Sequence, residues 1–153
     1  MKLRLIVIGK TERGFVADGV EHYIGRIRKK HPVEIIVLPE AGRGEASFQQ
    51  KQEGERVIAI LRPGEKIVVL DEGGKQFSSV SFAGHLQAWR DQGVRHCTFV
   101  IGGAFGVSDQ VRERADLIMS LSAMTFPHQL VRILFAEQLY RAYSIMEGGP
   151  YHH

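Results

Sequence analysis

The sequence predicts an α/β fold, with a mainly parallel sheet of five or six strands and helices on both faces. Short hydrophobic runs alternate along the chain with stretches whose apolar residues recur at helical spacing. Such alternation is typical of strand–helix–strand units, which produce parallel sheets. A chain of 153 residues is long enough to bury a substantial core, so we expect one domain over residues 1–153.

Five hydrophobic runs have the length and the flanking turn residues of strands. We predict these strands at Lys2–Ile8, Val33–Leu38, Lys66–Leu70, Cys97–Ile101 and Asp116–Ser120. The first run ends at Gly9, and the second ends at Pro39, which has no backbone N–H to donate to a sheet. After the third run, Asp71–Gly74 is predicted to turn the chain away from the sheet.

The segments between these strands carry helix signals. Serines stand where later helices are expected to begin, and in the first helix the apolar residues recur at helical spacing, at Phe15, Val16, Val20, Tyr23, Ile24 and Ile27. The predicted capping residues are Ser47, Ser79 or Ser81, and Ser108. We predict helices at about Gly14–Lys30, Ser47–Leu61, Ser79–Gly93, Ser108–Ala115 and Pro127–Met146.

The last predicted helix is apolar almost all round. Such a helix must be covered on several sides, so it either lies at the centre of the core or meets a second subunit. Arg132 and Arg141 interrupt its apolar surface and are candidates for reaching a phosphate. Glu137 stands four residues before Arg141, so these two side chains can instead form an ion pair.

The net charge of +3 fits either an anionic partner such as nucleic acid or a basic surface with no partner. Cations cluster at Arg26–His31, the end of the first predicted helix, where the helix dipole alone favours them. The one cysteine, Cys97, is expected to be a buried thiol. Because the sequence has no signal-peptide pattern and no long apolar run, we expect a cytoplasmic protein without a membrane span.

Two loops near the end of the chain favour a small-molecule site. Gly102–Gly106 follows the fourth strand, and a glycine turn lets a ligand approach the backbone closely. Ser120–His128 follows the fifth strand and can close the same crevice. We expect Gly103→Val to fill ligand space with little effect on folding. The terminal segment Gly148–His153 can bring an aromatic ring and an imidazole to this site, in the same subunit or in another.

Common nucleotide and metal motifs are missing. Gly9-Lys10-Thr11 resembles the end of a phosphate-binding P-loop, but Arg4 stands where that motif requires glycine. The Gly102–Gly106 turn lacks the spacing of a dinucleotide-binding site. Adjacent His152 and His153 are poorly spaced for chelation, so we expect no metal.

Several longer motifs resemble a known family. They are Leu70-Asp71, Phe99-x-Ile101-Gly-Gly-x-x-Gly106, Leu121-Ser-x-x-Thr125-x-Pro-His128-x-Leu-x-Arg132, Glu137-Gln-Leu-Tyr-Arg-Ala142 and the terminal Pro150-Tyr-His152. In these motifs, and in length and element order over the whole chain, the sequence resembles the bacterial ribosomal RNA large-subunit methyltransferase H family of the SPOUT class.

The resemblance implies a SPOUT-type α/β trefoil-knot fold in place of the unknotted doubly wound sheet that the pattern alone favours. It implies S-adenosyl-L-methionine as the cofactor and a homodimer as the active unit. The implied substrate is a pseudouridine in the helix 69 loop of 23S rRNA, which is methylated at N3 on the assembled 70S ribosome. Neither DNA nor a membrane is an implied partner.

The resemblance also assigns roles to residues. Its cofactor contacts fall on Leu70, Gly102, Gly103, Leu121, Ser122, Ala123, Met124, Thr125 and Phe126. Its catalytic candidates are Tyr151 and His152, which match the tail of the target-nucleotide site, and Arg141, which matches a basic residue near it. His153 stands where family members commonly carry Arg or Lys, and a neutral imidazole attracts phosphate less strongly.

The implied reaction is attack by N3 of the base on the sulfonium methyl group, which requires loss of the N3 proton. His152 is the candidate for handling that proton, and Tyr151 is the candidate for stacking on the base. Two alternatives stay open. One is a SPOUT enzyme for another RNA, such as a tRNA ribose 2′-O-methyltransferase, and the other is a non-catalytic ribosome-binding protein.

Overall fold

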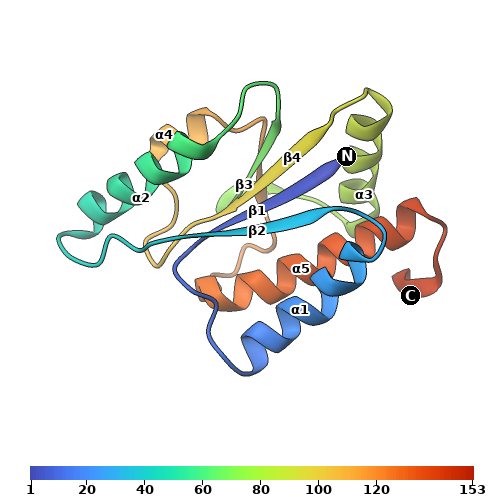
Figure 1. The fold of residues 1–153 in the computed structure, drawn as a ribbon, viewed down its shortest axis with the longest axis horizontal. Helices are drawn as coiled ribbons and strands as arrows, with labels where there is room; N and C mark the ends of the chain where they lie inside the picture. Colours follow the sequence, from blue (N-terminus) through green and yellow to red (C-terminus); the bar gives the residue numbers. More distant parts are fainter.

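The computed structural model describes residues 1–153 and contains one sheet of five strands, all of them parallel (Figure 1). The strand order across the sheet is β2-β1-β4-β3-β5. The strands are β1 (Lys2–Ile8), β2 (Val33–Leu38), β3 (Lys66–Gln76), β4 (His96–Ile101) and β5 (Leu117–Ser120). The predicted α/β class with a parallel sheet is therefore confirmed, whereas the trefoil knot stays a prediction.

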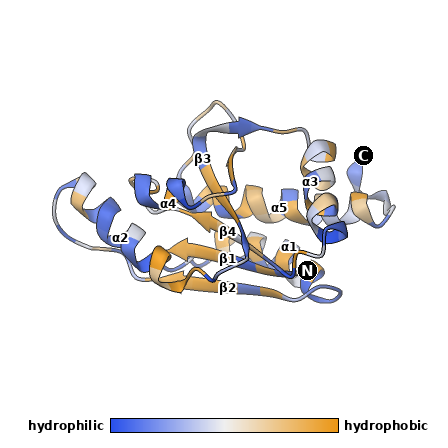
Figure 2. Ribbon diagram, turned by 90° about the horizontal axis from the view of Figure 1, so that it is seen from above, coloured by the Kyte–Doolittle hydropathy of each residue, from blue (hydrophilic) through white to orange (hydrophobic).

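Helices cover both faces of the sheet, as predicted. One face carries α1 (Phe15–Arg28), α3 (Ser79–Asp91) and α5 (His128–Met146), and the other carries α2 (Ala46–Ile60) and α4 (Asp109–Glu113). Strand β1 shows why two layers form, because Leu3, Leu5 and Val7 point into the first core whereas Ile6 and Ile8 point into the second. The central strands are strongly hydrophobic and α2 is largely hydrophilic (Figure 2).

Several predicted element boundaries differ from the structure. Ser47 is not a cap, since α2 begins at Ala46 after Glu45 without a side-chain cap hydrogen bond. The cap of α3 is Ser78, whose hydroxyl oxygen accepts a hydrogen bond from the N–H of Ser81. Ser108 does cap α4, as predicted. Neighbouring serines such as Ser78, Ser79 and Ser81 have the same side chain, so the sequence does not distinguish which of them caps the helix. The backbone conformation decides it.

The third strand is longer than predicted. Asp71–Gly74 does not lead the chain out of the sheet, because β3 continues to Gln76 and pairs with β5 a second time after a register shift. Gly74 makes this possible, since a Cβ on it would lie 2.7 Å from the carbonyl carbon and oxygen of Ile118. The irregular stretch is a bulge that bends the end of β3.

Helix α5 lies between α1 and α3 on one face of the sheet, and every residue of it is buried or half-buried. Arg132 does not reach outward to a phosphate. Its guanidinium is 1% exposed and donates to the carbonyl oxygens of Ile8 (2.6 Å) and Gly9 (2.9 Å) and to the hydroxyl of Thr11 (3.0 Å). The expected phosphate role of Arg132 is therefore wrong, because burial among backbone acceptors leaves no access to a ligand.

Cys97 is fully buried in β4, as predicted, and burial raises the pKa of its thiol. The thiolate form, which is the reactive form, is therefore suppressed. No helix of the structure combines the length and the apolar character needed to cross a bilayer.

A buried polar cluster fastens the turn before β3 to the central strands. Arg4 in β1 pairs with Glu65 at 2.8 Å between Nη1 and Oε2, and the two side chains are 2% and 0% exposed. The hydroxyl of Thr98 in β4 donates to the same carboxylate at 2.6 Å, and Arg4 also donates to the carbonyl oxygen of Ile60. The cluster thereby joins β1, β4, the end of α2 and the start of β3.

Burial by itself raises the pKa of Glu65. Hydrogen bonds from Thr98, the Arg62 backbone and Arg4 outweigh that effect, so the pKa lies below its usual value. A group whose pKa is lowered by folding stabilises the native state above its unfolded pKa, about 4.3 for glutamate. That contribution is lost as the pH falls through the lowered pKa.

We predict that Glu65→Gln lowers the free energy of unfolding at pH 7 by about 3–5 kcal/mol, because it leaves the Arg4 cation buried without a carboxylate. The difference from wild type should narrow as the pH falls below the unfolded pKa, about 4.3, and through the lower folded pKa of Glu65. Urea unfolding at several pH values measures both effects, with Glu113→Gln at an exposed position as the control. A difference that stays constant with pH would contradict the assignment.

Candidate functional site

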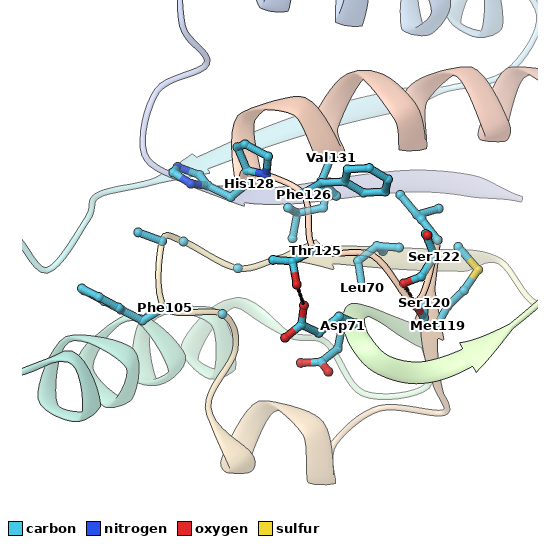
Figure 3. Close-up of a pocket in the computed structure, with 18 of the residues that line it drawn as sticks. Leu70, Asp71, Phe105, Met119, Ser120, Ser122, Thr125, Phe126, His128 and Val131 are labelled. Carbon is cyan, nitrogen blue, oxygen red and sulfur yellow. Dashed lines mark hydrogen bonds between the residues drawn. The ribbon is translucent and has the colours of Figure 1, made fainter.

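A pocket of about 640 Å³ opens at the carboxyl ends of β3, β4 and β5 (Figure 3). The turn Gly102–Gly106 after β4 forms one wall, and the loop Leu121–Pro127 after β5 forms another. His128 and Val131 contribute from the first turn of α5. The pocket lies where ligands bind in parallel α/β sheets, and its volume suits a small organic molecule.

The structure brings together the residues that the resemblance assigns to the cofactor. All of them line the pocket except Ala123, which is exposed on the same loop. The lining members of the predicted set are Leu70, Gly102, Gly103, Leu121, Ser122, Met124, Thr125 and Phe126. They meet because the carboxyl ends of parallel strands share one edge of the sheet.

An ion pair in the pocket wall was not predicted. Asp71, which follows Leu70, accepts two hydrogen bonds from Arg112 of α4, at 3.2 Å from Nε and 2.5 Å from Nη2. These bonds are the main reason that the pKa of Arg112 is raised. Asp71 follows the predicted buried strand Lys66–Leu70, and this position could have marked it as a candidate site residue. No pattern in the sequence distinguishes Arg112.

The loop after β5 is folded on itself and fastened across the pocket to β3. The Ser120 hydroxyl donates to the carbonyl oxygen of Ser122 at 2.7 Å, and the Ser122 hydroxyl accepts from the N–H of Met124 at 3.0 Å. Thr125 donates to Glu72 at 2.6 Å, which joins the loop to β3 (Figure 3). These bonds hold the backbone N–H and C=O groups of the loop at fixed positions along the pocket.

The glycine turn depends on its first glycine. A Cβ on Gly102 would lie 2.6 Å from the carbonyl carbon of Gly106 and 2.9 Å from the nitrogen of Val107. Any side chain at position 102 would therefore force the turn open. Gln50 of α2 supports the turn from outside, because its amide nitrogen donates to the carbonyl oxygens of Phe105 and Val107.

Gly103 has a different role from the expected one. A Cβ on Gly103 would point away from the pocket, to 2.8 Å from Oε2 of Glu53 and 3.2 Å from Cγ2 of Ile8. Glu53 is 5% exposed and packs in α2 behind the turn. A valine at position 103 would therefore press on the core behind the turn, which indicates a cost to folding. Its effect on cofactor binding stays a prediction.

The predicted catalytic residues do not lie at the pocket of their own chain. Tyr151 packs against Tyr140, and twelve residues separate Tyr140 from the pocket-lining His128, a distance of about 18 Å along the helix axis. Arg141 and His152 lie at the same remote end of α5 (Figure 1). The tail forms a short 3₁₀ helix, η1 (Pro150–His152), docked on α5.

The pair Glu137–Arg141 forms as the i, i+4 spacing predicted, with 2.6 Å between Oε1 and Nη2. The basic end of α1 is also engaged within the chain. Lys30 and His31 contact Glu147 at 2.7 and 2.6 Å, and the hydrogen bond from Lys30 is the main cause of the lowered pKa of Glu147. Lys30 forms an ion pair and His31 a hydrogen bond with the same carboxylate, so this basic segment joins the ends of α1 and α5 within the chain.

We predict that Gly103→Val lowers the free energy of unfolding by about 1–3 kcal/mol through overpacking against Glu53 and Ile8. Urea or thermal unfolding measures the change. The control is Gly84→Val, since a Cβ at position 84 of α3 has no heavy atom within 4 Å. Unfolding of Gly103→Val that matches this control would show that the core accommodates the side chain.

Comparisons with known proteins agree with the site. A family profile described as "Predicted SPOUT methyltransferase" matches residues 1–152. Proteins named "Ribosomal RNA large subunit methyltransferase H" align over the whole of this chain. The protein from Geotalea uraniireducens is 43% identical and that from Trichlorobacter lovleyi 44% identical, each over its full length. The protein from Parabacteroides distasonis is 40% identical, with 99% of its length aligned.

The profile and the relatives therefore cover the sheet, the pocket and nearly all of the tail together. The residues that the resemblance assigns to the cofactor, apart from Ala123, also line one pocket at the carboxyl edge of the sheet. The chain belongs to the SPOUT methyltransferase family.

Proposed function

We propose that this protein is a large-subunit rRNA methyltransferase that uses S-adenosyl-L-methionine to methylate N3 of a pseudouridine in the helix 69 loop of 23S rRNA, within the assembled ribosome in the cytoplasm. The observation that carries the proposal is the pocket, which is lined by the residues that the family resemblance assigns to the cofactor. Full-length identity of 40–44% to relatives named as large-subunit ribosomal RNA methyltransferases supports the substrate class.

The pocket has the chemistry that the cofactor requires. Leu70, Ile101, Met119 and Val131 offer apolar contacts for a flat ring system, and the two loops offer backbone hydrogen-bonding groups. The Glu72 carboxylate lies in the wall and favours a positively charged ligand, whereas the charge of Asp71 is balanced by its ion pair with Arg112. When bound, the cofactor supplies an electrophilic methyl group on sulfur.

The chain must supply groups that hold the target base and accept the N3 proton. His128 lines the pocket from its own chain. His152 is exposed at the end of the tail, and Tyr151 and Arg141 lie beside it. Because this tail is remote from the pocket of its own chain, we propose that it serves the pocket of a second subunit. Alignment of base and methyl group in such a shared site supplies rate by proximity.

The outward face of α5 supports a homodimer. It carries Leu130 and Leu134, together with the Glu137–Arg141 ion pair, and none of these residues is fully exposed. A solvent-facing helix surface normally carries polar residues, so an apolar stripe of this kind marks an interaction surface. The same helix contributes to the pocket at its start and holds the tail at its end.

The test uses the purified protein, calorimetry with S-adenosyl-L-methionine, and transfer of labelled methyl to ribosomes from a strain that lacks the enzyme. We expect cofactor binding, and mass spectrometry of the rRNA should find methyl at N3 of the helix 69 pseudouridine. Methylation of tRNA instead would indicate a SPOUT enzyme for another RNA. Ribosome binding without cofactor binding would indicate a non-catalytic protein.

We predict that Leu134→Glu disrupts the dimer, because it places a charge in the apolar stripe of α5. Analytical ultracentrifugation should show a shift to monomer, with loss of methyl transfer because the tail no longer reaches a partner pocket. Val80→Glu, at a 54% exposed apolar position of α3, is the matched control and should remain dimeric. A wild-type protein that is monomeric at micromolar concentration would refute the dimer.

We also predict that deleting residues 151–153 leaves folding, dimerisation and cofactor binding nearly intact. Methyl transfer to ribosomes should fall at least about tenfold, equivalent to roughly 1.4 kcal/mol of transition-state stabilisation. Labelled methyl transfer and calorimetry measure the two properties separately. A truncated protein that methylates at the wild-type rate would exclude the tail from catalysis and direct attention to His128.

A further inference from the structure

We propose that Tyr23 and Tyr140 are positioning residues, which hold the terminal segment Pro150–His152 so that His152 is presented for catalysis. This inference rests on the proposed function of the tail in methyl transfer. It concerns residues outside the pocket, on α1 and α5, that have no contact with the cofactor site of their own chain.

The tail is anchored by aromatic contacts. The ring of Tyr151 packs edge-on against Tyr140, with 4.7 Å between ring centroids. Tyr140 in turn lies 6.1 Å from Tyr23 of α1, and the guanidinium of Arg26 lies 5.6 Å from the Tyr140 ring. Aromatic pairs and cation–π pairs in this geometry contribute more stabilising free energy than the burial of their apolar area alone. The last aromatic residue of the chain is therefore joined to two helices.

Backbone hydrogen bonds fix the same segment. The N–H of Gly149 donates to the carbonyl oxygen of Ser144 at 2.7 Å, and the N–H of Tyr151 donates to the Ser144 hydroxyl at 3.3 Å. Arg141 donates to the carbonyl oxygens of Tyr151 at 3.3 Å and His152 at 3.1 Å. The tail is consequently held by α5 as an ordered turn.

Arg141 is itself held in place. Glu137 accepts two hydrogen bonds from its guanidinium, at 2.9 and 2.6 Å, and this pairing is the main reason that the pKa of Arg141 is raised. The guanidinium also lies 4.9 Å from the Tyr151 ring. Arg141 therefore acts on the tail in this structure, with its donors directed to tail carbonyls and to Glu137.

The platform under the tail is rigid because α1 and α5 approach closely. A Cβ on Gly19 of α1 would lie 3.0 Å from Ile133 of α5, so the helices are near contact one turn before Tyr23. The ion pair of Glu147 with Lys30 and its hydrogen bond with His31 join their ends. Burial, followed by the nearby Tyr23 hydroxyl, raises the pKa of Tyr151, in agreement with an enclosed phenol.

These contacts divide the tail into two parts. Tyr151 is the anchor, since its ring faces Tyr140 and Arg141. His152 is exposed, and only its backbone carbonyl is engaged, so its imidazole is available to a neighbouring subunit. An anchored Tyr151 restricts the positions that His152 can sample, which lowers the entropy lost when the imidazole meets a substrate.

The experiment compares wild type, Tyr140→Ala, Tyr140→Phe and Tyr23→Ala as full-length proteins. Carboxypeptidase removes terminal residues only from a released tail and slows at Pro150, and intact mass measures its rate. We expect release about fivefold faster in the two alanine variants, because each loses an aromatic contact. Tyr140→Phe keeps the ring and should match wild type. Phe77→Ala, which removes a ring from a pair remote from the tail, controls for general loosening.

The second readout is methyl transfer at saturating ribosomes and cofactor. The alanine variants should lose kcat about fivefold, with the calorimetric Kd for S-adenosyl-L-methionine unchanged, and Tyr140→Phe should restore kcat. Unchanged tail release in both alanine variants overturns the inference, as does faster release with unchanged kcat. If the wild-type protein transfers no methyl group, the proposed function fails, and the digestion rates still decide whether the tyrosines hold the tail.

Discussion

The pocket depends on the close approach of backbone segments at the carboxyl edge of the sheet. Gly74 lets the end of β3 lie against Ile118, and Gly102 lets the turn after β4 fold back on Gly106. Each approach is shorter than any side chain permits, so the pocket is lined by two loops whose main-chain groups are accessible. The approach of Gly74 allows β3 to pair with β5 again after the register shift.

Two buried arginines hold the layers around this edge. Arg4 joins β1 and β4 to the turn before β3 through Glu65, on the face covered by α2 and α4. Arg132 joins the start of α5 to the end of β1 through backbone carbonyls, on the opposite side of the sheet. Each satisfies groups that would otherwise be buried without partners, and each fixes a segment that leads to the site.

Helix α5 links the two ends of the proposed chemistry. Its first turn lines the pocket, and its last turns hold the tail on a platform shared with α1. The helix is too long for one chain to bring both ends to the same point. The proposed site shared between two subunits would resolve this separation, with the outward face of α5 as the proposed surface of contact.

The sequence by itself determined the alternation of strands and helices, the parallel sheet, the glycine turn and the family. These features follow from the periodicity of apolar residues and from motifs whose residues lie close together in the sequence. Its assignment of Leu70, Gly102 and Leu121 to one pocket held because parallel strands end at a common edge. Only the tertiary structure decided that Arg132 is buried, that Gly103 faces Glu53, and that Tyr151 docks on its own helix. The periodicity of the sequence shows which face of a helix or strand a side chain occupies. The residue that the side chain contacts depends on which distant segment of the chain packs against that face.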